Sequence, residues 1–376
     1  MDLSGQAGDE AVGRAAAEAT LLALRKEIDA VDDAILSLIN RRATLAQQTG
    51  PLKATHHLPI YDRAREDAIQ QRLSSQNVGP LTDEMVTRIF REVICASRAL
   101  QEPVTVAYLG PQGTFTHIAA VRYFGRSVAW LPLADVKTVF DAVQRDRADF
   151  GVVPIENSTE GGVHSTLDLL VDATICIYGE AIQPIEHHLL CAHERIAEIR
   201  RVASHPHAMA QCKAFLDNHL PGVPLLEMES TAHAAELARD DPQTAAIASD
   251  LAAQLYGLVV VKRRIEDAKN NVTRFLVLSK KPPARAPREK TSLLFALHDA
   301  AGALHQILRP FSAHRVNLTK IESRPSKKKA WEYLFYIDVD GHAQDSPLKE
   351  ALEEIRRLAV TTKVLGAYPA ASAPTT

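Results

Sequence analysis

The sequence predicts a multidomain protein with an all-α unit, a two-lobed α/β unit and an α+β unit, in that order. Three observations support this division. Apolar residues recur at steps of three and four through residues 18–102, which is a helical period. Short apolar strands alternate with helix-like stretches through residues 103–280. Residues 291–370 then follow the order βαββαβ, the ferredoxin-like arrangement.

The bulk composition is typical of a globular protein without a membrane or nucleic-acid partner. The chain has 376 residues, 46% of them hydrophobic, and a net charge of −3. No apolar run is long enough to span a bilayer, and the acidic, alanine-rich start does not resemble a signal peptide. The four cysteines lack metal-ligand spacing, which favours a reducing cytoplasm and predicts no metal site.

A long first helix dominates the all-α unit, which follows an expected flexible tail at 1–17. Its apolar seam consists of Leu21, Leu24, Ile28, Val31, Ile35, Leu38 and Leu45. Glycine and proline are absent from the seam until Gly50-Pro51, where we expect the helix to end. A second helix is expected from about Asp62 to Leu73, and Pro80 and Thr82 precede a third. Because the first helix has little to pack against in one chain, we expect a homodimer or a higher homo-oligomer.

In the α/β unit the spacing of apolar residues changes from the helical period to short apolar runs typical of strands. Its expected strands lie in "VTVAYLG", "FGVVPIEN", "TICIYGEAI", "HHLLCA" and "RVASHP", and its expected helices are 116–124, 136–145 and 208–219. This alternation predicts a substantially parallel sheet, and its length predicts two lobes with a cleft between them.

The proline-rich, basic segment 281–290 reads as a linker to the last unit. The unit itself is expected to contain a strand at 291–298, a helix from Gly302, strands at 315–323 and 332–340, a helix at 346–358 and a strand at 362–368. Residues 371–376 are expected to form a flexible tail.

Cations and neutral polar groups occupy seam positions of the helical unit. Arg42 falls between Leu38 and Leu45, where the period requires an apolar residue. A charge directed into a helical core must be paired. Structural ion pairs would explain any one such residue. The whole set fits a small dianionic ligand better, because guanidinium groups bind carboxylates bidentately. The set is Arg25, Arg42, Lys53, Asp62, Arg65, Glu66, Ser97 and Gln101.

The segments "LLALRKEIDAVDDAILSLINRRATLA" and "TRIFREVICASRALQ" resemble the all-helical chorismate mutases. The resemblance implies that Arg25, Arg42 and Arg65 bind substrate carboxylates, with Arg25 reaching the site of the partner subunit. Lys53 and Gln101 would donate hydrogen bonds to the ether oxygen, Asp62 and Glu66 would hold the hydroxyl region, and Ser97 would assist at a carboxylate. The rearrangement of chorismate to prephenate is pericyclic and needs positioning and charge stabilisation only. Pro51, two residues before Lys53, departs from the family pattern and predicts a kink.

Three short stretches of the α/β unit combine hydroxyls and amides with turns. "VAYLGPQGTFTHIAA" and "VVPIENSTEGGVHSTLDLL" each place them where a helix begins, which favours anions, although helix capping alone also explains each stretch. "NNVTRFLVL" places Thr273 and Arg274 at the start of a buried strand.

Together these stretches resemble prephenate dehydratase, whose fold is two-lobed and periplasmic-binding-protein-like. The resemblance implies that Thr273 supplies the catalytic hydroxyl and that Arg274 binds a substrate carboxylate. Prephenate would lose carbon dioxide and water to give phenylpyruvate, with no cofactor and no metal. The implied cleft residues are Thr114, Glu156, Asn157, Ser158, Ser204, His205, Gln211, Thr273, Arg274 and Phe275.

The last unit carries "AGALHQIL" and "NLTKIESRP", which resemble the ligand-binding signatures of the ACT regulatory domain. The resemblance implies that L-phenylalanine binds between two such domains and inhibits the dehydratase; a domain kept only for dimerisation is the alternative. The implied contacts are Gly302, Ala303, Leu304, Asn317, Glu322, Ser323, Arg324 and Pro325.

We therefore expect a bifunctional enzyme of phenylalanine biosynthesis with feedback inhibition, acting on chorismate and prephenate. Two alternatives stay open at this point. One is a two-lobed binding or regulatory protein with inactive catalytic sites, and the other is a dehydratase whose mutase is impaired by Pro51.

Overall fold

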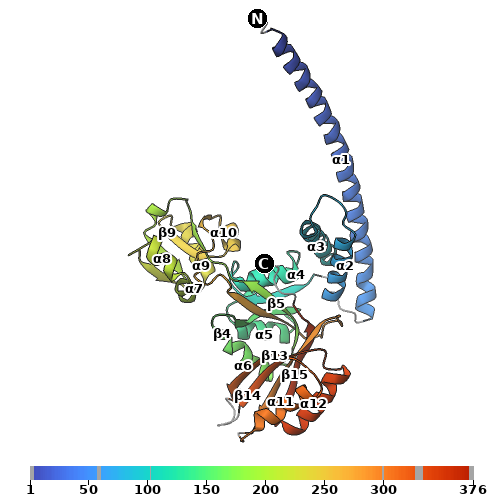
Figure 1. The fold of residues 1–376 in the computed structure, drawn as a ribbon, viewed down its shortest axis with the longest axis vertical. Helices are drawn as coiled ribbons and strands as arrows, with labels where there is room; N and C mark the ends of the chain where they lie inside the picture. Colours follow the sequence, from blue (N-terminus) through green and yellow to red (C-terminus); the bar gives the residue numbers. More distant parts are fainter. Residues whose placement is uncertain (1–3, 57–60, 102, 299, 327–332, 372–376) are drawn as a thin grey trace.

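The computed structural model describes residues 4–56, 61–101, 103–298, 300–326 and 333–371 (Figure 1). The chain forms a helical unit, a two-lobed α/β unit and a C-terminal α+β unit, as the sequence predicts. Within the described residues, no helix is both long and apolar enough to cross a membrane.

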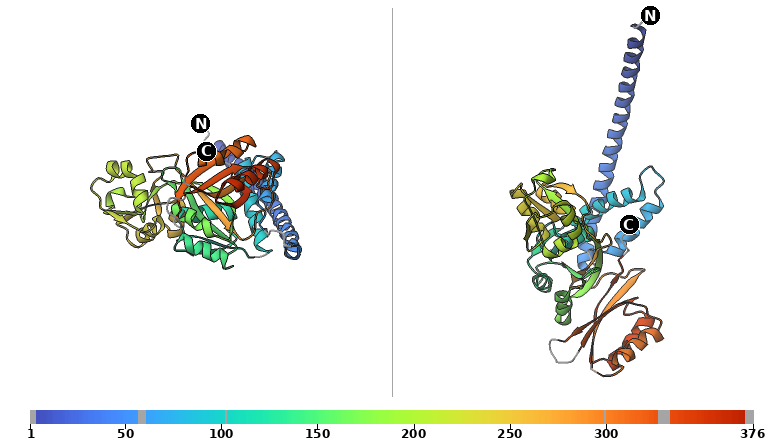
Figure 2. Two further views of the ribbon diagram at one scale, coloured as in Figure 1. Left: turned by 90° about the horizontal axis from the view of Figure 1, so that it is seen from below. Right: turned by 60° about the vertical axis from the view of Figure 1, so that its left-hand side comes forward.

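The first helix, α1 (Ser4–Thr55), is longer than predicted at both ends. Alanine-rich sequence extends it back to Ser4, so residues 4–17 continue the helix instead of forming a tail. It also continues through Gly50-Pro51, where we expected it to end. Pro51 removes only one amide donor, and the next turn is held by bonds such as the one from His56 N to Leu52 O, 3.1 Å. The N-terminal part of α1 stands clear of the other elements (Figures 1 and 2).

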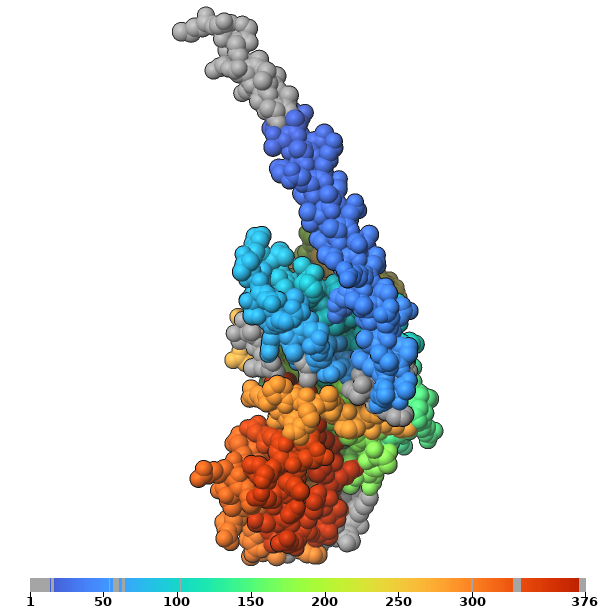
Figure 3. Space-filling view, turned by 90° about the vertical axis from the view of Figure 1, so that its right-hand side faces the viewer, coloured from blue at the N-terminus to red at the C-terminus, as the bar shows by residue number. Residues whose placement is uncertain are grey.

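Two shorter helices follow, of which α3 packs on the C-terminal part of α1 and α2 packs on α3. Asp62 caps α2 (Arg63–Ser75) and Thr82 caps α3 (Asp83–Ala99) by accepting hydrogen bonds from the first-turn amides of Arg65 and Met85. None of the residues that the structure describes covers the apolar seam farther up α1, where Ile28 and Leu38 are 57% and 64% exposed. Figure 3 shows this upper part of α1 projecting beyond the remaining surface.

The first lobe of the α/β unit is a mixed sheet with the order β2-β1-β3-β11-β5. Its strands are β1 (Thr105–Leu109), β2 (Ala129–Leu133), β3 (Phe150–Asn157), β5 (Cys176–Pro184) and β11 (Val272–Ser279), with the short β4 (Gly161–Gly162) beside β3. β1 is parallel to β2 and β3, but β11 is antiparallel to both β3 and β5. The sheet is therefore less parallel than predicted, because β11 returns to it from the second lobe.

Each face of this sheet has its own core. α4 (Phe115–Phe124) covers one face together with Tyr61, which enters from the helical unit and is 1% exposed. α5 (Val136–Gln144), α6 (His164–Asp172) and the C-terminal sheet cover the other face. The side chains of β11 alternate between the two cores, with Phe275 in the first and Leu276 in the second.

The second lobe is a five-stranded sheet with the order β10-β6-β9-β7-β8. Its elements are β6 (His188–Cys191), β7 (Arg201–Ser204), α7 (Pro206–Gln211), α8 (Lys213–His219), β8 (Leu225–Glu227), α9 (Thr231–Asp240), β9 (Thr244–Ala248), α10 (Asp250–Tyr256) and β10 (Val259–Lys262), with a 3-10 turn at Ile196–Glu198. The helix expected at 208–219 is two helices, because Cys212 at their junction has a non-helical backbone.

The C-terminal unit has the predicted βαββαβ order. It consists of β12 (Glu289–Leu297), α11 (Ala303–Ala313), β13 (Leu318–Pro325), β14 (Tyr333–Asp340), α12 (Ser346–Leu358) and β15 (Thr361–Pro369), with the sheet order β13-β14-β12-β15. The two helices pack on one face of the sheet. The other face packs through Leu294, Tyr336 and Leu365 on the first lobe.

Candidate active sites

The first candidate site lies between α1 and α3. The Arg42 guanidinium donates to Ser97 Oγ at 2.5 Å and to Val93 O at 3.3 Å. Burial lowers the pKa of Arg42, and the carboxylate of Glu66 opposes that shift. The structure thus brings Arg42 and Ser97 together, with Glu66 close enough to act on the guanidinium.

Lys53 and Gln101 meet at the same end of α1. Lys53 Nζ lies 3.4 Å from Gln101 Oε1. Burial lowers the pKa of Lys53, while the carboxylates of Asp62 and Glu66 raise it. Because α1 continues through Pro51, the proline does not carry Lys53 away from its predicted neighbours.

A residue that we did not predict, Arg98, completes this cluster. Its guanidinium pairs with Glu66 at 2.5 Å, lies 4.5 Å from the ring centroid of Tyr61 and donates to the carbonyl of Phe124. Arg98 is 4% exposed, so the pair is shielded from solvent. Its position next to Ser97 in "ASRALQ" was the only sequence signal.

The structure links three other predicted residues, Asp62, Arg65 and Arg25, less closely to this cluster. Asp62 Oδ1 accepts from the amide of Arg65 at 3.0 Å as the cap of α2, and the Arg65 side chain is exposed. Arg25 precedes Arg42 by 17 positions on α1, which is about 25 Å along the helix axis. Arg25 therefore cannot reach the cluster of its own chain.

The second candidate site is at one end of the first-lobe sheet. Asn157, Thr273 and Gln183 are paired across β3, β11 and β5, so their side chains share one face. Asn157 Nδ2 donates to Thr273 Oγ1 at 2.8 Å. Thr273 is 8% exposed. Since Oγ1 accepts from Asn157, the hydroxyl hydrogen of Thr273 is left to donate elsewhere.

A hydrogen-bond network runs from this site to the second lobe. Asn271 Oδ1 accepts from Asn157 at 2.9 Å, and Asn271 Nδ2 donates to Gln211 Oε1 at 3.1 Å. Gln211 also contacts His187 Nε2 at 2.9 Å and donates to Glu160 at 3.0 Å.

Ser158 joins this network through its Oγ, which donates to Asn271 Oδ1 at 3.5 Å and accepts from the amide of Val272 at 3.0 Å. Sequence reasoning missed four participants: Asn271, Gln183, His187 and Glu160. Of these, Asn271 had a usable signal, because it precedes Thr273 by two residues in the stretch "NNVTRFLVL".

Three other predicted cleft residues have structural partners. Thr114 caps α4, accepting from the amide of His117 at 3.3 Å. Ser204 is fully buried and donates to the carbonyl of Ile247 at 2.7 Å. His205 caps α7, accepting from the amide of His207, and burial lowers its pKa.

The structure corrects the roles of Arg274, Glu156 and Phe275. Arg274 follows Thr273 on a strand, so its side chain lies on the opposite face. There it contacts Glu180 at 2.7 Å and Glu156 at 3.8 Å. Phe275 is 2% exposed in the core under α4. Arg274 and Glu156 therefore lie on the face opposite Thr273, so Arg274 is turned away from a substrate bound at Thr273. Phe275 shares the face of Thr273 but is buried in the core.

The predicted regulatory residues divide between two surfaces. Gly302 begins α11 with a φ of +81°, a left-handed conformation that suits glycine, and Leu304 beside it is exposed together with Ser323 and Pro325. Asn317 bonds to Asp340 at 2.8 Å.

Glu322 and Arg324 alternate with Ser323 and face the first lobe instead. The Glu322 carboxylate lies against Gly162, and Arg324 is 3.4 Å from Asp168 of α6. In this arrangement they are contacts between the two units, and their role as direct ligand contacts stays a prediction.

The comparisons with known proteins agree with the three-unit division. Residues 24–102 match the family model for chorismate mutase type II, residues 106–283 match prephenate dehydratase, and residues 291–357 match the ACT domain. A bifunctional chorismate mutase/prephenate dehydratase from Aquifex aeolicus (strain VF5) is 44% identical over 352 residues, which cover 93% of this chain and 97% of the relative.

Two solved structures resemble the part that follows the helical unit. A prephenate dehydratase from Arthrobacter aurescens, in complex with L-Phe, is 39% identical with a TM-score of 0.65, covering 72% of this chain and 93% of its own. The quorum-quenching acylase GqqA is 33% identical with a TM-score of 0.65, covering 71% of this chain and 98% of its own.

Proposed function

The chain belongs to the family of bifunctional chorismate mutase/prephenate dehydratases, and from this premise we propose how its residues divide the two reactions. The enzyme rearranges chorismate to prephenate and then converts prephenate to phenylpyruvate, in the biosynthesis of phenylalanine. We assign residues 18–102 to the mutase, 103–280 to the dehydratase and 291–370 to the regulatory domain.

The mutase site is built from Arg42, Lys53, Ser97 and Gln101. Arg42 would bind a carboxylate of the substrate, held in place by Ser97. Lys53 and Gln101, 3.4 Å apart, would both direct hydrogen bonds to the ether oxygen as its bond breaks. Fixed donors suffice, because a pericyclic rearrangement needs a compact substrate and stabilised charge and no nucleophile.

A second copy of the chain would complete this site. The uncovered seam of α1 is a continuous apolar surface, and its residues at Leu24 and Ile28 are more than half exposed. A partner helix on that seam would shield it and bring the partner's Arg25 toward the cluster around Arg42. We therefore propose a homodimer as the minimal active mutase.

In the dehydratase, Thr273 would protonate the departing hydroxide while carbon dioxide leaves and the ring becomes aromatic. The observation that carries this proposal is the bond from Asn157 Nδ2 to Thr273 Oγ1 at 2.8 Å. That bond polarises the hydroxyl and leaves its hydrogen free to be directed at the leaving group. Gln183, across the sheet from Thr273, is placed to contact the same substrate.

The C-terminal domain would bind L-phenylalanine, the ligand found in complex with the related prephenate dehydratase from Arthrobacter aurescens. The exposed residues Gly302, Leu304, Ser323 and Pro325 form the surface that we assign to it. Binding there would favour an arrangement in which the dehydratase is less active. The four free cysteines suit a reducing compartment, so we place the enzyme in the cytoplasm.

The test supplies purified protein with chorismate or with prephenate, each with and without L-phenylalanine. We expect phenylpyruvate from both substrates and less of it when phenylalanine is present. Folded protein that forms no prephenate from chorismate refutes the mutase assignment, and folded protein that forms no phenylpyruvate from prephenate refutes the dehydratase assignment.

A further inference from the structure

Arg274 lies next to Thr273 in the chain but is held by a different domain. Its Nε donates to Glu180 of β5 at 2.7 Å, and its Nη1 donates to Asp338 of β14 at 2.5 Å. Its Nη2 donates to the hydroxyl of Tyr368 on β15 at 3.0 Å. Two of these three partners therefore belong to the C-terminal domain.

The guanidinium and its carboxylate partners are shielded from water. The side chains of Arg274, Glu180 and Asp338 are 13%, 1% and 8% exposed. The other oxygen of Asp338 accepts from Ser292 Oγ at 2.5 Å, and Lys290 lies 3.0 Å from Glu180. Because each group in such a network fixes its neighbours, the position of Arg274 depends on how the C-terminal sheet is docked.

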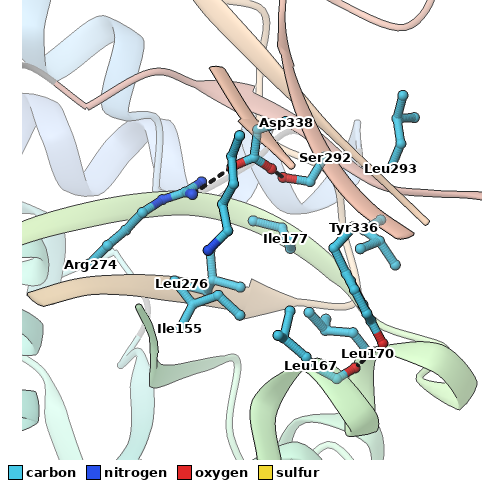
Figure 4. A pocket seen from close by; sticks show the side chains of 12 residues that line it. Ile155, Leu167, Leu170, Ile177, Arg274, Leu276, Ser292, Leu293, Tyr336 and Asp338 are labelled. Atoms are coloured by element: carbon cyan, nitrogen blue, oxygen red, sulfur yellow. Dashed lines mark hydrogen bonds and ion pairs between the residues drawn. The ribbon is translucent and has the colours of Figure 1, made fainter. Parts of the chain in front are cut away.

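A small cavity adjoins this cluster. It has a volume of about 20 Å³, which is room for about one water molecule. Figure 4 shows Arg274, Asp338 and Ser292 at one end of it and Leu167, Leu170 and Tyr336 at the other.

The neighbouring strand β3 is irregular at this point, so β11 is regularly paired on one side only, with β5. Arg274 pairs with Glu156 and Phe275 with Pro154, which leaves Ile155 as an extra residue in β3. Such bulges redirect side chains and often lie beside active sites. Consecutive Cα atoms are about 3.8 Å apart, so a shift of Arg274 is passed directly to Thr273.

We propose that Arg274 is a positioning residue of the dehydratase, and that Asp338 of the C-terminal domain fixes it in place. The C-terminal domain thereby supports the catalytic hydroxyl from the far face of the sheet. This inference rests on the proposed function, in which Thr273 is the proton donor.

The decisive variant is Asp338→Asn in the full chain, which keeps the shape of the side chain and removes its charge. We expect kcat for prephenate to fall about three- to tenfold with KM changed less than twofold, because the substrate does not contact Asp338. Turnover of chorismate in the same sample should be unchanged, which shows that the helical unit is intact. Tyr368→Phe removes one weaker acceptor and should lower kcat by a smaller factor.

Lys363→Met is the matched control. Lys363 also joins the two domains, donating to the carbonyls of Leu170, Val171 and Ala173 at 2.6–3.0 Å, and these three hydrogen bonds go to α6 and the residue after it and not to β11. We expect its dehydratase kcat to stay within twofold of wild type. An equal loss in Lys363→Met would mean that docking in general matters and would overturn the assignment to Arg274.

The two proposals fail in different ways. A wild-type chain without dehydratase activity overturns the proposed function and this inference with it. An active wild type together with an Asp338→Asn variant of wild-type kcat overturns only the inference.

Discussion

Replacing Thr273 by valine separates chemistry from folding at the dehydratase site. Valine has nearly the shape of threonine, so the substitution opens no cavity at the 8%-exposed Thr273. Asn157 loses one acceptor but still donates to Asn271 at 2.9 Å. One amide hydrogen of Asn157 is left without its partner, so the cost in folding stability should be about 1–3 kcal/mol.

The expected catalytic cost is larger. Positioned proton donors contribute about 10²–10⁴-fold to rate, which is roughly 3–5 kcal/mol of transition-state stabilisation. We expect kcat for prephenate to fall by that factor in Thr273→Val, while chorismate turnover stays near wild type. Phenylpyruvate formation, corrected for the spontaneous reaction, is the measurement, and Thr273→Ser is the control that keeps the hydroxyl.

Two results would refute this reasoning. If Thr273→Val retains kcat within threefold of wild type, the hydroxyl is not the proton donor. If Thr273→Ser loses as much activity as Thr273→Val, the site depends on the methyl group and its packing.

Four further predictions concern the other sites. Arg42→Ala should lower mutase kcat/KM by roughly 10²–10³-fold and spare the dehydratase, because one fixed cation is lost from a charge-stabilising site; full mutase activity in this variant would remove Arg42 from the site. Ile28→Asp should yield monomers by light scattering and reduce mutase activity more than about tenfold, since it places a charge on the proposed dimer seam; an unchanged dimer would contradict that surface. Ser323→Ala should raise the phenylalanine concentration needed for half-inhibition about tenfold, because it leaves a ligand group unpaired, whereas unaltered feedback would exclude this contact. Burial lowers the pKa of His117 to about 4, so as the pH falls from about 6.5 this histidine becomes protonated in the unfolded chain before it does so in the folded chain. Up to about 3 kcal/mol of folding stability should therefore be lost between pH 6.5 and 4. His117→Gln should show a smaller drop in melting temperature across that range.

Strong periodicity made some elements predictable and its absence hid others. The alternation around β13 and the apolar face of α12 gave boundaries close to those observed. β9, in contrast, is the run Thr-Ala-Ala-Ile-Ala, and alanine has a low preference for strands. It forms a strand because all five residues are buried between β6 and β7, which no local pattern reveals.

At the candidate sites, too, some features were predictable from the sequence and others were not. The resemblance to known families selected Arg42, Ser97, Thr273 and Asn157, and the structure brings these residues together in two pairs. The same resemblance assigned Arg274 to the substrate, but its guanidinium lies on the other face of the sheet. A motif names the residues at a site, whereas the face on which each one lies depends on what packs there.

The sequence by itself determined the three units, their order and the residue types of both sites, because helical and strand periods and local motifs are written along the chain. Only the tertiary structure decided that Arg98 pairs with Glu66, that Asn271 and Gln211 join the two lobes, and that Asp338 holds Arg274. These contacts join residues far apart in the chain, and the buried environment that makes each of them necessary exists only after the units have packed together.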